Sequence, residues 1–298
     1  MAWTFYFYTP SGPAAGIFVV LLGSSTILHF YQLLRTRTWF MLPFFIGGAL
    51  ETIGYIGRLL SSIEAPEYTK GPYIMQSALI LIAPAFLAAS VYMTLGRIIH
   101  MVDGEKCSLI KLRWLTKIFV TGDVLSFLMQ ASGAGLMVKD TTNPSTGEHI
   151  IIGGLFVQII FFGFFIITTT AFQLRITRRP SGRSIDLGNL WHRHLIALYV
   201  TGALILVRSI VRLVEYIQGY DGYLMKEEAF IYVFDGLLMF VAMLVLHYVH
   251  PSEINCLIGR GGRYSEKIFK TRKFVPASAL EMNAPMPRAY VQARSSDC

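Results

Sequence analysis

Residues 150–174 read IIIGGLFVQIIFFGFFIITTTAFQL, an apolar run of 25 residues without an ionisable side chain. The hydrocarbon core of a bilayer is about 30 Å thick, and a helix needs roughly 20 apolar residues to cross it. A strand of a membrane barrel would alternate apolar and polar positions, which this run does not do. The segment therefore predicts a membrane-spanning helix.

The composition of the whole chain agrees with a membrane protein. Of its 298 residues, 54% are hydrophobic and 15% are charged, whereas soluble domains average about 25% charged residues. The high hydrophobic content excludes a disordered chain, and the scarcity of charge argues against a soluble α/β enzyme. The predicted spans are 14–34, 39–60, 72–96, 114–138, 150–174, 194–217 and 228–250.

The basic residues indicate the orientation of these spans. Alternate segments between them hold 19 Lys and Arg residues on one side and 3 on the other. Cytoplasmic loops carry the excess of positive charge, so we expect the N-terminus outside the cell and the C-terminus in the cytosol. The net charge of +8 is then a topology signal and does not indicate nucleic-acid binding.

The expected fold class is an all-α membrane protein with a bundle of seven transmembrane helices. Residues 1–13 would form an extracellular segment, residues 14–250 the transmembrane domain, and residues 251–298 a basic, disordered cytosolic tail. The basic charge of that tail fits a solvated stretch that fixes topology. A second interpretation is that the tail binds anionic lipids of the inner leaflet.

Polar residues inside the predicted spans form stripes along helix faces. Glu51 and Arg58 are seven residues apart, and Arg208 is followed at spacings of four and three by Arg212 and Glu215. Residues at these spacings share one helix face. The candidate substrate-binding residues are Glu51, Arg58, Gln76, Asp123, Gln130, Arg208, Arg212, Glu215 and Asp235.

A charge at the centre of a membrane helix costs roughly 2.5 kcal/mol or more, so it persists when it is paired, hydrated or functional. One interpretation of the stripes is a structural ion-pair network without a ligand. The favoured one is a hydrated cavity towards the outer leaflet, because the cluster is larger than packing requires. In that cavity carboxylates would pair with a cationic amine, while arginines would balance them or bind a phosphate.

Several motifs of chemistry are absent from the sequence. It has no Gly-x-x-x-x-Gly-Lys-Ser/Thr loop, no His-Glu-x-x-His and no Cys-x-x-Cys. We therefore expect no ATP-driven pump, no enzyme, no metal site and no cofactor. Ser25 with His29, and His247 with His250, are nearest to a membrane metal-hydrolase pattern, but they are interpreted as interfacial histidines.

Several motifs together resemble one known family. They are Glu51-Thr-Ile-Gly-Tyr-Ile-Gly-Arg58, Gln76, Ala83-Pro84-Ala85-Phe86, Asp123-Val-Leu-Ser-Phe-Leu-Met-Gln130, Arg208-x-x-x-Arg212-x-x-Glu215, Glu228 with Tyr232 and Asp235, and His250-Pro251. This set resembles the fungal RTA-like proteins, also called lipid-translocating exporters, from about Tyr8 to Pro251. One departure is Ser252, where the family often has glycine.

The resemblance implies a seven-span membrane protein, often of the plasma membrane. It also implies resistance to sterol analogues and sphingoid long-chain bases, with membrane lipids as the partners. We therefore expect a multi-pass protein that moves an amphipathic lipid, such as a sphingoid base, and confers resistance to it. The alternatives are a receptor or stress sensor with the same fold and no transport activity, and a metal-dependent intramembrane hydrolase.

Overall fold

The computed structural model describes residues 6, 8–139, 145–219 and 222–259. In this part of the chain the secondary structure is entirely helical. The elements are α1 (Gly12–Thr36), η1 (Trp39–Met41), α2 (Leu42–Ile63), α3 (Lys70–Met101), η2 (Glu105–Cys107), α4 (Leu112–Lys139), α5 (Ser145–Arg178), α6 (Gly182–Asp186), α7 (Asn189–Gln218), α8 (Tyr223–Lys226), η3 (Ile231–Leu237), α9 (Leu238–Tyr248) and α10 (Ser252–Leu257).

Six helices in the described ranges are long and apolar enough to cross a membrane, by length and composition. They correspond to α1, η1 with α2, α3, α5, α7, and the segment from η3 to α10. The chain is thus a multi-pass membrane protein. The predicted span 114–138 is also helical, since α4 covers it with 28 residues. It is not one of the six, because Lys117, Asp123 and Gln130 make this helix more polar.

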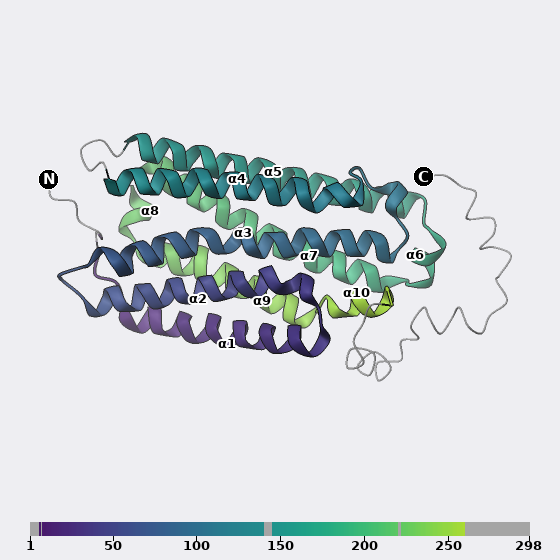
Figure 1. The fold of residues 1–298 in the computed structure, drawn as a ribbon, viewed down its shortest axis with the longest axis horizontal. Coiled ribbons are helices and arrows are strands. Elements are labelled where there is room, and N and C mark those ends of the chain that lie inside the picture. The colour runs from purple at the N-terminus through teal and green to yellow at the C-terminus, as the bar shows by residue number, and fades with distance from the viewer. Residues whose placement is uncertain (1–5, 7, 140–144, 220–221, 260–298) are drawn as a thin grey trace.

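The long helices run side by side along the longest axis of the molecule (Figure 1). Helix α3 has a central position, since it packs against α2, α4 and α7. The pair α4 and α5 lies on one side of α3, and the pair α1 and α2 lies on the other. The short helix α8 lies near one end of the bundle, and α6 and α10 lie near the opposite end (Figure 1).

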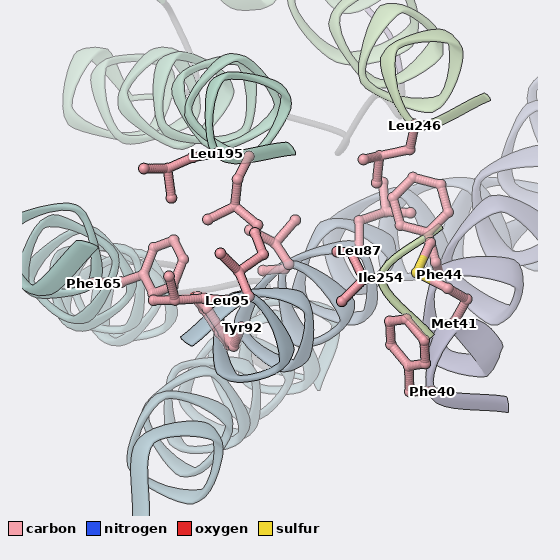
Figure 2. Packing of buried hydrophobic residues seen from close by; sticks show 14 of the residues in the cluster. Phe40, Met41, Phe44, Leu87, Tyr92, Leu95, Phe165, Leu195, Leu246 and Ile254 are labelled. Carbon is pink, nitrogen blue, oxygen red and sulfur yellow. The ribbon is translucent and has the colours of Figure 1, made fainter. Parts of the chain in front are cut away.

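The core is built around two sides of α3 (Figure 2). Tyr92 of α3 faces Phe165 of α5, with ring centroids 4.7 Å apart. Leu87 lies towards Phe44 of α2, and both side chains are fully buried. Between membrane helices such contacts act mainly through van der Waals packing. The central helix therefore positions its neighbours on both sides.

Small residues allow α2 to approach α3 closely. A Cβ atom at Gly47 would lie 2.9 Å from the backbone oxygen of Ala83. A Cβ atom at Gly57 would lie 3.1 Å from the backbone oxygen of Pro72. Close backbone approach through small residues is typical of membrane helix pairs. It determines how near the polar stripe of α2 lies to α3.

The start of the predicted tail differs from the expectation. We expected disorder from residue 251, but Ser252–Leu257 form α10, and every residue of this helix is buried. Ile254 packs in the main core, and Asn255 accepts a hydrogen bond of 2.7 Å from Arg97. The physical reason is that this segment carries its own apolar residues, which the count of basic residues ignores. The rest of the tail, residues 260–298, lies outside the described residues.

The contact between α2 and α3 makes a stability prediction. Gly47→Ala should lower the free energy of unfolding by about 1–3 kcal/mol, because the new methyl group meets backbone that cannot rotate away. Thermal or denaturant unfolding in detergent measures the change. Gly163→Ala is the matched control, since nothing lies within 4 Å of its Cβ position, and it should be neutral or stabilising by up to about 1 kcal/mol. Equal effects at both positions would contradict this packing.

Candidate functional site

A proline in the central helix creates an acceptor for a buried arginine. Helix α3 continues through Pro84, which has no N–H, so the carbonyl of Ile80 four residues earlier loses its helical donor. Arg208 of α7 donates from Nη2 to this carbonyl oxygen at 2.5 Å. The side chain of Arg208 is fully buried. The carbonyl group that Pro84 leaves without a helical donor in α3 thus receives a hydrogen bond from a charged side chain of α7.

Asp235 pairs with two arginines of α7. Its Oδ1 lies 2.8 Å from Nε of Arg208, and its Oδ2 accepts a hydrogen bond from Arg212. Asp235 lies in η3, a π-helical stretch of a kind that is frequent at functional sites. Tyr55 of α2 donates to the carbonyl oxygen of Ile231 at 3.0 Å, at the first residue of this stretch. Helices α2 and α7 therefore both bind η3 through polar groups.

The polar stripe of α7 continues towards α8. Arg212 also donates to Glu215 at 2.9 Å. The two side chains are partly exposed, 14% and 16%, whereas Arg208 and Asp235 are almost completely buried. The stripe thus runs from the interior of the bundle to an accessible edge.

A second group of polar residues surrounds Arg58. This arginine is fully buried and donates to Glu228 Oε1 at 2.8 Å. It also donates to the hydroxyls of Tyr232 and Tyr8, both at 3.0 Å. Glu228 in turn accepts a hydrogen bond of 2.7 Å from the backbone N–H of Ser11. This group ties the start of the chain to α2 and η3.

Glu51 lies in the same interior as the pair of Arg208 and Asp235, and these two groups act on it electrostatically. Its side chain is fully buried. Within the described part of the chain, neither carboxyl oxygen has a hydrogen-bond partner. Arg208, Arg212, Glu215 and Asp235 form a charged cluster. Glu51 is near this cluster but makes no hydrogen bond to it.

Asp123 and Gln130 take part in different contacts. Gln130 donates to Ser126 at 2.7 Å and to Gln158 of α5 at 3.2 Å. Asp123 is buried, and its titratable neighbour is Tyr92 of α3. Both residues are candidate substrate-binding residues of the sequence analysis, and the structure places them in contacts of α4 with α5 and α3. Their role in binding stays a prediction.

Gln76 joins the accessible edge of the cluster. It is buried and accepts a hydrogen bond of 3.0 Å from the hydroxyl of Tyr6. Burial raises the pKa of the Tyr6 phenol, which keeps its proton available for this bond. The ring of Tyr6 also contacts Tyr68 and Tyr73, with centroids 4.9 Å and 5.4 Å away. Tyr6, which precedes α1 in the chain, therefore packs on this end of the bundle.

Two pockets adjoin at this edge, one polar and one apolar. The polar pocket has a volume of about 100 Å³, and Gln76, Arg212 and Glu215 are among its lining residues. The apolar pocket has a volume of about 370 Å³ and lies against α3, α4 and α5. The residues that line both are Tyr73, Ser77, Leu81, Tyr216 and Met225. The arrangement offers a polar compartment next to a larger apolar one, with five lining residues in common.

A family model described as RTA1 like protein matches residues 44–256. The chain belongs to the RTA1-like protein family. The matched range begins in α2 and ends in α10, so it contains the arginines, their acidic partners and Glu51. Tyr6 and Tyr8 lie outside it.

Curated relatives of this RTA1-like chain come from Saccharomyces cerevisiae. The chain is 41% identical to Protoporphyrin uptake protein 1, over 80% of this chain and 89% of that one. It is 39% identical to Protein RTA1, over 78% and 71%. It is 29% identical to Sphingoid long-chain base transporter RSB1, over 78% and 70%. No solved structure matches the chain significantly.

The histidines of this RTA1-like chain lie elsewhere. The rings of His29 and His247 stack with centroids 3.6 Å apart. His247 also contacts the hydroxyl of Ser25 at 3.0 Å. Among the described residues, no group of three or more His, Cys, Asp or Glu side chains could hold a metal ion. His29 is buried inside the protein.

The sequence missed three polar members of the site. Glu228 was noted only as part of a family motif, and Tyr6 and Tyr8 were not considered. The available signal was the spacing, because Glu51, the acid of the candidate set nearest to Arg58 in the sequence, is seven residues away. Glu228, at the end of the loop before η3, supplies the acid that pairs with Arg58.

The pair of Arg58 and Glu228 makes a stability prediction. Glu228→Gln should lower the free energy of unfolding by about 2 kcal/mol, because it leaves a buried guanidinium without a counter-charge. The value is below that of a fully buried pair since the Glu228 side chain is 20% exposed. Denaturant unfolding in detergent measures it. Glu227→Gln changes the exposed neighbouring residue and should have an effect within about 0.5 kcal/mol; a larger effect there than at Glu228 would contradict the pairing.

Proposed function

We propose that this protein binds an amphipathic lipid at the adjoining pockets and moves it across the membrane, thereby conferring resistance to it. The observation that carries the proposal is that the polar pocket, lined by Arg212 and Glu215, adjoins the apolar pocket and shares five lining residues with it. The headgroup of the lipid would occupy the polar pocket, and its hydrocarbon chain would occupy the apolar pocket. Few polar groups in a mostly apolar cavity are typical of small-molecule sites. No covalent chemistry is required for this role.

The substrate class follows from the charges of the polar pocket. It holds a carboxylate beside an arginine, so it suits a small headgroup with an amine, as in a sphingoid base. The names of two relatives support a role in the movement of such molecules. One name refers to sphingoid long-chain base transport, and the other refers to protoporphyrin uptake. Both compounds combine a large apolar part with ionisable groups.

The proposed topology has seven spans, with the N-terminus outside and the C-terminus in the cytosol. Helix α4 would be the seventh, because its 28 residues extend about 42 Å, and it packs along α5. The excess of Lys and Arg supports this orientation. It places the pockets towards the outer leaflet, in a membrane that we propose to be the plasma membrane, and the basic tail next to anionic inner-leaflet lipids.

Transport in a purified system tests the proposal. The protein is reconstituted into liposomes, and the transbilayer movement of a fluorescent sphingoid base is measured. Ala134→Phe should reduce protein-dependent movement by about tenfold or more, because the ring fills the apolar pocket that Ala134 lines. Ala203→Phe is the matched control, since Ala203 is exposed on α7, and it should leave movement unchanged.

Two results would count against the proposal in different ways. Binding of the lipid without movement would exclude transport and favour the receptor or stress-sensor alternative. Movement that is equally fast with Ala134→Phe and with wild type would show that the lipid does not use these pockets.

A further inference from the structure

The positive and negative charges around Arg58 and along α7 are equal in number without Glu51. Three arginines and three carboxylates pair with one another in two groups. They are Arg58 with Glu228, and Arg208 and Arg212 with Asp235 and Glu215. An ionised Glu51 would add a fourth negative charge to three positive ones.

The surroundings of Glu51 offer no compensation for that charge. The side chain is fully buried, and neither oxygen is hydrogen-bonded within the described residues. Removing an unpaired carboxylate from water is far more costly than removing the neutral acid. Arg208, the strongest positive influence on Glu51, already binds Asp235 and the carbonyl of Ile80. The neutral form of Glu51 therefore fits this arrangement.

Among the described residues, charged groups of α7 and η3 act on Glu51. The charged groups that act on Glu51 are Arg208 and Arg212 of α7 and Asp235 of η3. On α1 and α3, the side chains against the neighbouring glycines of α2 are those of Thr26, Leu87 and Ile80, which do not titrate. One turn further along α2, the hydroxyl of Tyr55 donates a hydrogen bond to the carbonyl oxygen of Ile231.

We propose that Glu51 is a proton-binding site whose proton is released when a cationic headgroup enters the polar pocket. This inference rests on the proposed function and deepens it, because it assigns the coupling ion for a lipid amine. The exchange conserves charge: one ammonium group enters the cluster, the O–H bond of Glu51 breaks, and one proton leaves to water. The entering cation is the fourth positive charge, and the Glu51 carboxylate is the fourth negative one.

Ion pairs connect the pocket to Arg208, and Arg208 acts on Glu51 electrostatically. Arg212 lines the polar pocket and pairs with Asp235. Asp235 pairs with Arg208, and Arg208 acts on Glu51. An ammonium that binds the carboxylates of Glu215 or Asp235 competes with their arginines. An arginine freed in this way can turn to Glu51, so the headgroup need not reach Glu51 itself.

The test uses purified full-length protein in detergent, with sphinganine as the cationic probe and N-acetyl sphinganine as its uncharged counterpart. In weak buffer with an indicator dye, wild type should release about one proton for each sphinganine bound, and none for the amide. Its affinity for sphinganine should rise with pH by up to about tenfold per unit. Glu51→Gln should show, at every pH, the weak affinity that wild type shows at low pH, and should release no proton.

Matched variants separate this role from a structural one. Glu51→Asp keeps a carboxyl group and should retain proton release. Glu67→Gln removes the charge of an exposed carboxylate away from the charged groups of the site and should retain the wild-type pH slope. Gel filtration and a thermal melt establish that each variant is folded.

The outcomes separate the two claims. A pH slope in Glu51→Gln equal to that of wild type would overturn the assignment of Glu51, as would sphinganine binding by wild type without proton release. In both cases the proposed lipid site would stand. Failure of wild type to bind either probe at any pH would overturn the proposed function together with the proton site.

Discussion

The pairing of Arg208 with Asp235 is the interaction on which the site depends. A guanidinium at membrane depth must find counter-charge and hydrogen-bond acceptors inside the protein. The structure supplies both, since Asp235 pairs with Nε and the carbonyl freed by Pro84 accepts from Nη2. One residue of α7 is thereby bound to the middle of α3 and to η3. Replacing any of these groups leaves a polar partner unsatisfied in an apolar interior.

This constraint explains how the bundle can keep a polar compartment beside an apolar one. The glycines of α2 let that helix lie close to α3, which brings Tyr55 and Arg58 against η3. The buried half of the cluster then orients the partly exposed pair of Arg212 and Glu215 at the polar pocket. Small residues of α4, including Ala131 and Ala134, line the apolar pocket. An amphipathic ligand fits such a boundary because each of its parts meets a matching surface.

Much of this arrangement could be predicted from the sequence, for a physical reason. Misplacing an apolar run or a buried charge in a membrane costs free energy. The apolar runs therefore indicate where the helices lie, and the buried charges indicate that Arg208, Arg212, Glu215 and Asp235 come together. The spacing could not say which neighbour a stripe faces, and Asp123 and Gln130 contact α3 and α5 instead of the cluster. Nor could it predict Tyr6, Tyr8 and Glu228, whose roles depend on how chain ends and loops fold over the helices. The helix α10 was missed because its few apolar residues are followed by a basic segment.

A double-mutant cycle between Arg208 and Asp235 tests the central claim most directly. The free energy of unfolding in detergent is measured for wild type, Arg208→Gln, Asp235→Asn and the double variant. If the two side chains form a buried pair, the double variant should lose about 2 kcal/mol less than the sum of the single losses. Losses that add to within about 0.5 kcal/mol would show that the two residues do not interact, and the polar cluster described here would be contradicted.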